Sequence, residues 1–255
     1  MSIADKFRLD GRTALITGAG RGIGRACSVA LAEAGAEVWL AARTKAEIEQ
    51  VAEEIRAAGG KAKAVVCDVT DAHAVRNAMS MRVLDIVVNN AGSNIPEPFV
   101  DVSEAHLDQL MNLNLRAAFI VAQTAAKKML QDANRKERGG AIINMSSQMG
   151  HVGAPLRSVY CMTKHGIEGL TKAIAVELAP HNIRVVSIAP TFIETPMTKP
   201  MMAKPEFAKW VLDRIPLGHG GQPQDVAAAV VFAASPAAAL VTGSSLLLDG
   251  GWTSQ

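Results

Sequence analysis

The sequence has few cysteines and no strong excess of charge. Its three cysteines, Cys27, Cys67 and Cys161, are far apart and show no metal-ligand spacing. They exclude a disulfide framework, they are typical of small buried side chains in a reducing compartment, and we expect no metal ion. The formal net charge of +2 is too small to indicate nucleic acid or an acidic membrane as a partner. The densest basic cluster, at 135–138 (RKER), contains a glutamate and precedes a glycine pair, which indicates a solvated loop.

Long apolar runs are also missing. No stretch reaches the roughly 18 uncharged apolar residues of a membrane-spanning helix. The first residues, MSIADKFRLDG, have no apolar run after their charges and do not resemble a secretory signal. With 49% hydrophobic and 20% charged residues, the composition is that of an ordinary globular protein. No repeat or long linker divides the chain. We therefore expect a cytoplasmic protein with a single domain over residues 1–255.

Short apolar runs alternate with helical stretches along the whole chain. The expected strands are 12–17, 37–42, 61–67, 84–89, 141–146, 183–189 and 245–248. The expected helices follow a glycine turn near residue 22 and cover 45–58, 71–81, 103–131, 158–179 and 224–234. Strands rich in Val and Ile that alternate with helices indicate a parallel sheet covered on both faces. The sequence predicts an α/β fold, a doubly wound seven-stranded parallel sheet flanked by helices (Rossmann-like).

A glycine-rich turn follows the first expected strand. Residues 17–24 read TGAGRGIG and precede an alanine-rich helical stretch. Strand, glycine turn and helix together present a helix N-terminus to a pyrophosphate. The spacing differs from the GxGxxG fingerprint of dinucleotide sites, so an ordinary turn remains an alternative. The position after the first strand nevertheless favours phosphate binding.

The end of the second expected strand indicates which nucleotide would bind. In nucleotide folds an acid at this position binds the ribose 2′-hydroxyl, whereas a nearby arginine accepts a 2′-phosphate. Here the acid position holds Ala42, and Arg43 follows. Arg21 in the glycine turn offers a second cation. Both arginines could be solvated surface residues, but the missing acid favours NADP(H) over NAD(H), which remains possible.

Tyr160 and Lys164 form a possible acid–base pair. They are four residues apart, so on a helix they lie on one face. A nearby ammonium group favours the phenolate, so we expect Lys164 to lower the pKa of Tyr160 from its usual value near ~10. Ser147 ends an apolar run and could donate a hydrogen bond to a substrate oxygen. Taken alone, this short pattern is also typical of a surface helix with a packed tyrosine.

Further polar residues lie where several strands end. Right-handed crossovers place the carboxyl ends of parallel strands at one edge, which is where open α/β sheets bind ligands. The glycine turn, Arg43, Asp68 and Asn90 all fall at such ends. Asn114 lies inside the long expected helix 103–131, for which Ser103 is the expected N-cap. A mid-helix asparagine is unfavourable unless its side chain has a partner or a role.

Taken together, the motifs resemble those of the short-chain dehydrogenase/reductase family, in its compact branch of about 250 residues. The resemblance runs from residue 12 to residue 252. The shared motifs are TGAGRGIG at 17–24, DVTD at 68–71, NNAG at 89–92, Asn114 in NLNL, Ser147 in NMSS, Tyr160-x-x-x-Lys164 and the C-terminal VTG and DGG. Together, these ordered motifs at consistent spacing are specific, although each one alone is weak.

The resemblance implies a role for each matched residue. Tyr160 would be the general acid/base, and Lys164 would lower its pKa and bind the nicotinamide ribose. Ser147 would hold the substrate carbonyl or hydroxyl, and Asn114 would hold a water that links Lys164 to solvent. The predicted cofactor residues are Gly18, Arg21, Gly22, Ile23, Gly24, Arg43, Asp68, Val69, Asn90, Ala91, Gly92, Tyr160, Lys164, Pro190, Ile193 and Thr195. One departure is Pro190-Thr191, where the family often has Pro-Gly.

The substrate is less well defined by the sequence. The predicted substrate residues are Asn94, Ser147, Gln148, His151 and Phe192, although Gln148 and His151 could equally be loop residues that face water. Their polarity favours a polyol, sugar or sugar acid over the alternative, a 3-oxoacyl thioester. We expect residues 12–190 to form the cofactor and catalytic core and residues 191–220, rich in Pro and Met, to form a substrate lid. Lys199, Lys204 and Arg214 in it could attract a carboxylate or form a solvated helix face.

Two readings from other functional classes remain. A cofactor-binding redox sensor without catalysis would be expected to have a broken Ser-Tyr-Lys set, and the set is intact here. A structural or assembly role would be expected to show large apolar surfaces. A milder version can coexist with catalysis, since the family resemblance implies a homotetramer. Helices 103–131 and 158–179 would pack across one two-fold axis, and helix 224–234 with the last strand across another.

Overall fold

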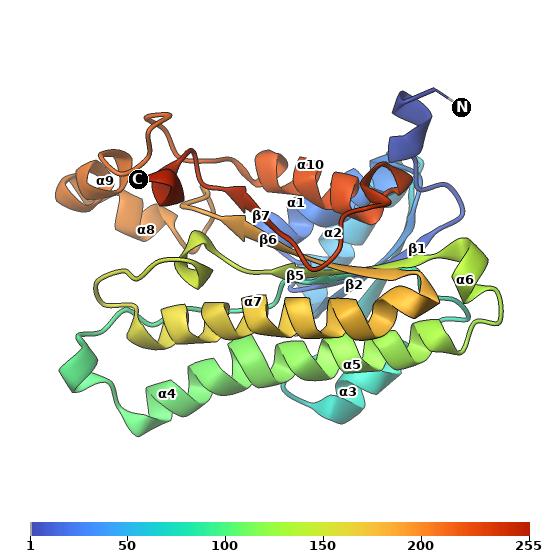
Figure 1. Ribbon diagram of the computed structural model, residues 1–255, viewed down its shortest axis with the longest axis horizontal. Coiled ribbons are helices and arrows are strands. Elements are labelled where there is room, and N and C mark those ends of the chain that lie inside the picture. Colours follow the sequence, from blue (N-terminus) through green and yellow to red (C-terminus); the bar gives the residue numbers. More distant parts are fainter. Residues whose placement is uncertain (1) are drawn as a thin grey trace.

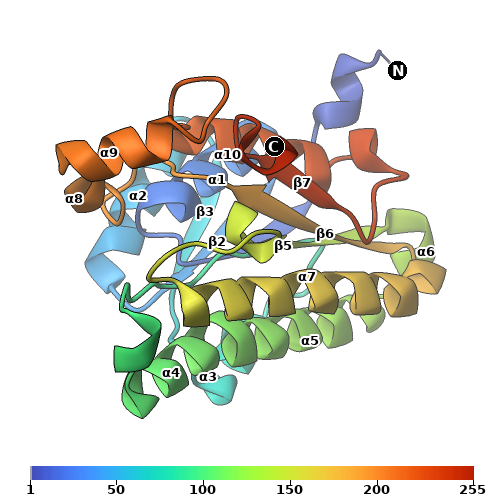
Figure 2. The same cartoon turned by 60° about the vertical axis from the view of Figure 1, so that its left-hand side comes forward.

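The computed structural model describes residues 2–255 and contains a parallel sheet with helices on both faces (Figures 1 and 2). The strands are β1 (Thr13–Thr17), β2 (Glu37–Ala42), β3 (Lys61–Val66), β4 (Ile86–Asn89), β5 (Gly140–Met145), β6 (Ile183–Pro190) and β7 (Ser245–Leu248). Their spatial order is β3-β2-β1-β4-β5-β6-β7, and every neighbouring pair is parallel. The order reverses between β1 and β4, which opens a crevice at their carboxyl ends. The predicted doubly wound, seven-stranded fold is confirmed.

The helices form two layers (Figure 1). One face of the sheet is covered by α1 (Gly22–Glu33), α2 (Lys45–Ala57) and α10 (Pro223–Ala234). The other face is covered by α3 (Ala72–Ala78), α5 (Ala117–Leu130) and α7 (Ser158–Leu178), with α4 (Glu104–Leu110) leading into α5. The short helices are α6 (Arg135–Arg138), α8 (Lys199–Met202) and α9 (Pro205–Leu212). No helix among residues 2–255 is both long and apolar enough to cross a membrane.

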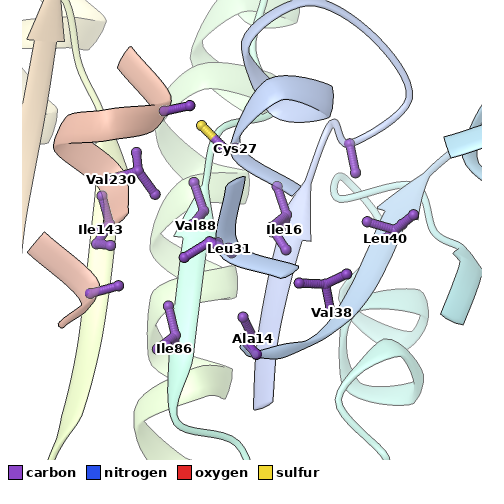
Figure 3. Packing of buried hydrophobic residues seen from close by; sticks show 14 of the residues in the cluster. Ala14, Ile16, Cys27, Leu31, Val38, Leu40, Ile86, Val88, Ile143 and Val230 are labelled. Carbon is purple, nitrogen blue, oxygen red and sulfur yellow. The ribbon is translucent and has the colours of Figure 1, made fainter. Parts of the chain in front are cut away.

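Alternation along the strands buries both faces of the sheet. Ile16 packs in the cluster beneath α1 and α10, whereas its neighbour Leu15 packs on the opposite side. Figure 3 shows Ile16 and Val88 beside Cys27 and Leu31 of α1. All of these side chains are at most 1% exposed. Burying such an aliphatic side chain contributes about 1.5–3 kcal/mol, so this core fixes the strand ends that form the crevice.

The predicted helix 103–131 is helical from 104 to 130, but it is not a uniform α-helix. Ser103 caps α4 as expected, because its hydroxyl accepts a hydrogen bond from the His106 N–H at 3.2 Å. A wider π-helical turn (Met111–Arg116) then separates α4 from α5. Asn114 lies in this turn, and its side chain bonds to groups outside the helix. Single π-turns inside helices frequently occur at functional sites.

The predicted solvated loop at 135–138 is also wrong. Arg135 is 3% exposed, and it joins Arg138 and Arg12 around the buried carboxylate of Asp85. Arg138 Nε lies 2.5 Å from Asp85 Oδ1, and the Thr13 N–H donates to Asp85 Oδ2 at 2.9 Å. Asp85 directly precedes β4, so the cluster lies at the amino ends of the strands. The cluster stabilises the edge of the sheet opposite the crevice.

Candidate active site

A cleft of about 340 Å³ lies at the carboxyl ends of the strands. Every predicted cofactor residue lines it, from Gly18, Arg21, Gly22, Ile23 and Gly24 through Arg43, Asp68, Val69, Asn90, Ala91 and Gly92 to Tyr160, Lys164, Pro190, Ile193 and Thr195. Ser147 lines it as well. Side chains far apart in the sequence therefore meet in one cleft, which begins at the glycine turn and continues to α7.

The glycine turn brings the backbone of α1 close to the end of β1. A Cβ atom on Gly24 would lie 2.1 Å from the Gly18 carbonyl oxygen, so no other residue fits there. Gly18 has φ +64°, a left-handed conformation that favours glycine. The turn leaves the N-terminal N–H groups of α1 open to the cleft. Such groups bind phosphate oxygens.

Thr17 and Asn90 hold this turn against β4. The Thr17 hydroxyl accepts hydrogen bonds from the backbone N–H groups of Asn90 (2.9 Å) and Ala91 (3.0 Å). The Asn90 side chain returns a bond to the Thr17 carbonyl at 2.9 Å. These bonds join the loops after β1 and β4 at the reversal of strand order. Sequence reasoning placed Asn90 at the cofactor but missed Thr17, whose position at the end of β1 was the available signal.

The end of the cleft beside β2 and β3 carries two arginines and two acids, Glu47 and Asp68. Arg21 and Arg43 are both exposed there, and Ala42 leaves no carboxylate at the end of β2. Asp68, at the end of β3, accepts hydrogen bonds from the Thr70 N–H and hydroxyl at 2.9 and 2.8 Å. The hydrogen bond from the Thr70 N–H is the main reason that the pKa of Asp68 is lowered, and the charge of Arg43 acts in the same direction.

Lys164 is buried beneath Tyr160. Its ammonium group donates a hydrogen bond to the Met145 carbonyl at 2.7 Å and lies 5.5 Å from the centre of the Tyr160 ring. Only 6% of the lysine is exposed. Burial lowers its pKa to about 8, while the charge of Glu168, one turn further along α7, raises it. The lysine can therefore exchange a proton near neutral pH.

The pKa of Tyr160 differs from the sequence-based expectation. Burial raises it, whereas the Ser147 hydroxyl and the charge of Arg157 act to lower it. The expected lowering by Lys164 is not found. Tyr160 therefore stays protonated at neutral pH in this arrangement. A protonated phenol in a cleft suits the role of proton donor.

Ser147 lies at the end of β5, beside Tyr160. Its hydroxyl accepts a hydrogen bond from the Met149 N–H at 3.2 Å and donates to the Pro190 carbonyl at 3.4 Å. The second bond is long, so the hydroxyl proton can turn to another acceptor. The short helical turn Gln148–Gly150 that it caps directs the chain away from the cleft.

Asn114 is 2% exposed and does not line the cleft. Its amide closes two hydrogen bonds on the backbone of Ser93, with a longer one of 3.4 Å to the Thr163 hydroxyl. Thr163 in turn donates to the Tyr160 carbonyl at 2.8 Å. Asn114 therefore joins the loop after β4 to the helix that carries Tyr160.

Apart from Ser147, none of the predicted substrate residues, which are Asn94, Gln148, His151 and Phe192, lines the cleft. The Asn94 Oδ1 and Gln148 Nε2 atoms are buried without a hydrogen-bond partner. Phe192 is 8% exposed and stacks on Trp252, with ring centres 5.9 Å apart. The structure does not bring His151 to the cleft. Its Nε2 atom lies 2.9 Å from Ser245 Oγ and 3.3 Å from Glu168 Oε1, because the turn after Ser147 points it towards β7.

Comparison with known proteins gives consistent relatives. A family model described as enoyl-(acyl carrier protein) reductase matches residues 18–253. L-xylulose reductase from Bos taurus is 38% identical over 96% of this chain and 98% of its own. Gluconate 5-dehydrogenase from Gluconobacter oxydans is 36% identical over 99% of both chains. A 3-oxoacyl-[acyl-carrier-protein] reductase from Thermotoga maritima is 38% identical over 96% of this chain and 99% of its own.

Solved structures agree over the whole length. A short-chain type dehydrogenase/reductase from Mycobacterium marinum is 38% identical, with a TM-score of 0.93 over 100% of both chains. A gluconate 5-dehydrogenase from Burkholderia cenocepacia, crystallised with NADP and tartrate, is 35% identical, with a TM-score of 0.94 over 100% of both chains. These matches span the glycine turn, the Tyr160–Lys164 pair and the C-terminal strand, and the chain belongs to the short-chain dehydrogenase/reductase family.

Proposed function

We propose that this protein is an NADP(H)-dependent oxidoreductase that interconverts a secondary alcohol and a ketone, with a polyol, sugar or sugar acid as substrate. The observation that carries the proposal is the position of Lys164, whose buried amine lies 5.5 Å from the centre of the Tyr160 ring in a cleft that begins at a glycine turn. L-xylulose reductase and gluconate 5-dehydrogenase among the relatives support the reaction class and the substrate class.

The residues present fit a dinucleotide. A Cβ on Gly24 would meet the Gly18 carbonyl oxygen at 2.1 Å, so the glycine lets α1 start directly against the turn, as in dinucleotide sites where a glycine allows close packing of the helix. Arg21 and Arg43 offer cations for a 2′-phosphate, and the absence of an acid at Ala42 removes the usual partner of a free ribose hydroxyl. The relative crystallised with NADP supports the same choice. When bound, NADP(H) supplies or accepts the hydride.

The chain itself supplies the proton. In the direction of reduction, Tyr160 Oη donates its proton to the substrate oxygen, while Ser147 Oγ hydrogen-bonds that same oxygen. Lys164, whose pKa is about 8, can then return a proton to Tyr160. We propose that Asn114 helps to hold the water that links Lys164 to solvent, and that its bonds to Ser93 fix the loop after β4.

The substrate would lie between Tyr160 and residues 191–220, which we propose to act as a lid. Asn94 and Gln148 do not line the cleft, but each has a buried polar atom without a protein partner in the loops after β4 and β5, which supports a substrate with several hydroxyl groups. Phe192, from the loop after β6, does not line the cleft and packs in an apolar cluster with Val211 and Trp252. We do not propose His151 as a substrate-binding residue, because its ring contacts Ser245 and Glu168.

A substrate panel tests this proposal. Initial rates with NADPH and with NADH would be measured by absorbance for a ketose, a keto sugar acid and a 3-oxoacyl thioester. We expect turnover of a ketose or keto acid and a clear preference for NADPH. Turnover of the thioester alone would replace the substrate class. Cofactor binding without turnover of any substrate would favour the non-catalytic alternative.

A second candidate function is reduction of a 3-oxoacyl thioester. The observation in its favour is the relative from Thermotoga maritima, at 38% identity over nearly the full length. A long acyl chain needs an apolar channel, whereas two buried polar atoms, Asn94 Oδ1 and Gln148 Nε2, lack partners here. We therefore rank it second, and the thioester in the panel decides between the two.

We also propose a homotetramer. The outer faces of α5 and α7 expose Phe119 (46%) and Val176 (78%), and Leu247 on β7 is 42% exposed. Exposed apolar residues on two separate faces are what a tetramer with two kinds of two-fold interface requires. Sedimentation at dilute concentration should give a tetramer, and a clean 26.8 kDa monomer would contradict this. The separated, mostly buried cysteines suit a reducing compartment, so we propose a cytoplasmic location.

A further inference from the structure

Arg157 is buried without an acidic partner. Only 5% of this residue is exposed, and no carboxylate among residues 2–255 lies within 4.0 Å of its guanidinium group. Arg135 offers a comparison within the same chain, because it is equally buried but forms ion pairs with Asp85 and Asp132. Burying a cation without a partner is costly in free energy, and binding an anion would offset that cost.

Most of the hydrogen-bonding capacity of Arg157 is uncommitted. Its Nη1 atom donates to the neighbouring Leu156 carbonyl at 3.2 Å, and its Nη2 atom to the Met201 sulfur at 3.4 Å. A thioether sulfur is a weak acceptor, whereas a guanidinium group has five N–H donors arranged to match a carboxylate. Burial also lowers the pKa of Arg157. An anion placed here would satisfy the donors and the charge together.

The position of Arg157 relates it to the substrate. It is the N-cap residue of α7 and precedes Tyr160 by three residues. Its charge is close enough to act on the pKa of Tyr160. Met201, which it contacts, lies in α8, within residues 191–220. The guanidinium group therefore contacts the proposed lid and lies close enough to influence the proton donor, although Arg157 is outside the set of residues that line the cleft.

The surrounding loop is fixed in the same arrangement. Leu156 has φ +60°, a left-handed conformation that costs about 1–2 kcal/mol for a residue with a side chain. Its carbonyl accepts a hydrogen bond from the Glu97 N–H at 3.2 Å as well as the bond from Arg157. The loops after β4 and β5 also hold the two buried polar atoms without partners, Asn94 Oδ1 and Gln148 Nε2. These atoms are one acceptor and one donor that no protein group satisfies.

We propose that Arg157 binds the carboxylate of the substrate, so that the preferred substrate is a keto sugar acid rather than a neutral ketose. This inference rests on the proposed function and narrows its substrate class. The carboxylate would be held by paired N–H donors of the guanidinium group, while the reacting carbonyl meets Tyr160 and Ser147. Arg157 is thus a specificity-determining residue, while Tyr160 supplies the proton.

A matched pair of substrates tests the subsite. The 5-keto form of D-gluconate and L-sorbose differ in that the first has a carboxylate where the second has a CH₂OH group. For Arg157→Leu we expect kcat/KM for the keto acid to fall roughly 10- to 100-fold, mainly through KM, with L-sorbose changed less than about threefold. Arg157→Lys should restore part of the loss. An equal effect on both substrates, or none on either, would overturn the proposal.

Two controls sharpen this result. Lys204→Leu removes an exposed cation from residues 191–220, and it should leave the ratio between the two substrates unchanged. A similar fall for Lys204→Leu would mean that general attraction, and not a subsite, selects the anion. A ketose phosphate serves as the third substrate, since a guanidinium group also fits a phosphate. Preference for it over the keto acid would overturn the assignment of a carboxylate.

A binding measurement separates the subsite from the reaction. Quenching of NADPH fluorescence would be followed as D-gluconate or sorbitol is added, because the reduced cofactor cannot reduce either compound. We expect the wild type to bind gluconate at least about tenfold more tightly than sorbitol, and Arg157→Leu to lose this preference. Equal binding of the two would overturn the subsite even if ketones are reduced. A gluconate preference without any turnover would instead reject the proposed function alone.

Discussion

The side chain of Asn114 forms two hydrogen bonds with the backbone of Ser93. Its Oδ1 atom accepts from the Ser93 N–H at 2.9 Å, and its Nδ2 atom donates to the Ser93 carbonyl at 2.8 Å. These bonds satisfy the N–H and the carbonyl of Ser93, which lies in the loop after β4 and outside the sheet. It also explains why an asparagine lies in a π-helical turn, where its side chain can leave the helix.

Asn114→Ala should therefore loosen the loop after β4. Two backbone groups of Ser93 would lose their partners, at a cost of about 1–3 kcal/mol in the free energy of unfolding. We expect kcat to fall about 10- to 100-fold through misplaced groups near Tyr160. Asn112→Ala, an exposed change in the same turn, is the matched control. Urea unfolding and steady-state kinetics measure both effects, and equal behaviour of the two variants would contradict the role of Asn114.

Glu168 should set the alkaline limit of the reaction. Burial lowers the pKa of Lys164 to about 8, and the Glu168 carboxylate opposes this shift. The other neighbours of the Glu168 carboxylate are the hydroxyls of Ser187 (2.7 Å) and Ser245 (3.2 Å) and the ring of His151. Removing the negative charge in Glu168→Gln disfavours the protonated lysine, so the pKa of Lys164 falls further.

We therefore expect the rate of ketone reduction in the wild type to decline as the pH rises through about 8, where Lys164 loses its proton. In Glu168→Gln the same decline should begin at lower pH. The pH dependence of kcat with saturating cofactor measures this. Glu177→Gln, an exposed change on the same helix, should leave the profile where it is. A shift of the Glu168→Gln profile to higher pH would show that the electrostatic assignment is wrong.

Arg43 should distinguish the two nicotinamide cofactors. An exposed arginine at the end of β2 can meet a 2′-phosphate but has no equivalent group to meet in NADH. For Arg43→Ala we expect the Kd of NADPH to rise about tenfold or more, with that of NADH within about twofold. Lys61→Ala removes an exposed charge at the other end of β3 and is the control. Equal weakening of the binding of both cofactors would show that Arg43 does not bind the 2′-phosphate.

Asp85 should stabilise the fold without taking part in the reaction. Burial alone would raise its pKa, but hydrogen bonds from Arg138 and the Thr13 N–H, with the charges of Arg138 and Arg12, hold it below the usual value. Asp85→Asn removes the carboxylate shared by Arg12, Arg135 and Arg138 and leaves Asp132 as the remaining partner of Arg135, which we expect to cost about 3–5 kcal/mol in the free energy of unfolding at pH 7. As a control, Asp10→Asn removes an exposed carboxylate that pairs with Arg8, and it should have no measurable effect on the free energy of unfolding.

The pH dependence of this difference has a definite sign. A carboxylate with a lowered folded-state pKa contributes stability above its unfolded pKa, near ~3.9, and loses it as the pH falls through the folded value. The gap in stability between wild type and Asp85→Asn should therefore shrink below about pH 4. Chemical denaturation at several pH values measures it. A gap that persists unchanged into acid would show that the carboxylate is not held ionised by the arginines.

Much of the fold could be predicted because its signals are local. The apolar runs and the glycine turn placed all seven strands to within two residues, and the ordered motifs identified the cleft. What failed depends on contacts distant in the sequence. Arg135 and Arg138 look like a solvated cluster until Asp85, about 50 residues earlier, is placed against them. The π-helical turn likewise depends on the bonds between Asn114 and Ser93, 21 residues away.

The site shows the same division. Residue types and spacing indicated Tyr160, Lys164 and Ser147, because a helix brings positions four apart together. The environment of these residues could not be inferred in that way. Burial raises the pKa of Tyr160, which spacing alone predicted to fall. The isolation of Arg157 could not be predicted either, since the absence of a carboxylate near it becomes visible only when every neighbour is placed.

The most direct test of the central claim compares the wild type with Tyr160→Phe in one assay, with NADPH binding and ketone turnover measured on the same sample. Tyr160 is the only tyrosine in the chain, so no other phenol can replace it. We expect NADPH to bind with unchanged affinity while kcat falls by about 10²-fold or more, because only the proton donor is removed. A variant that keeps the wild-type kcat would contradict the role assigned to Tyr160 and the mechanism built on it.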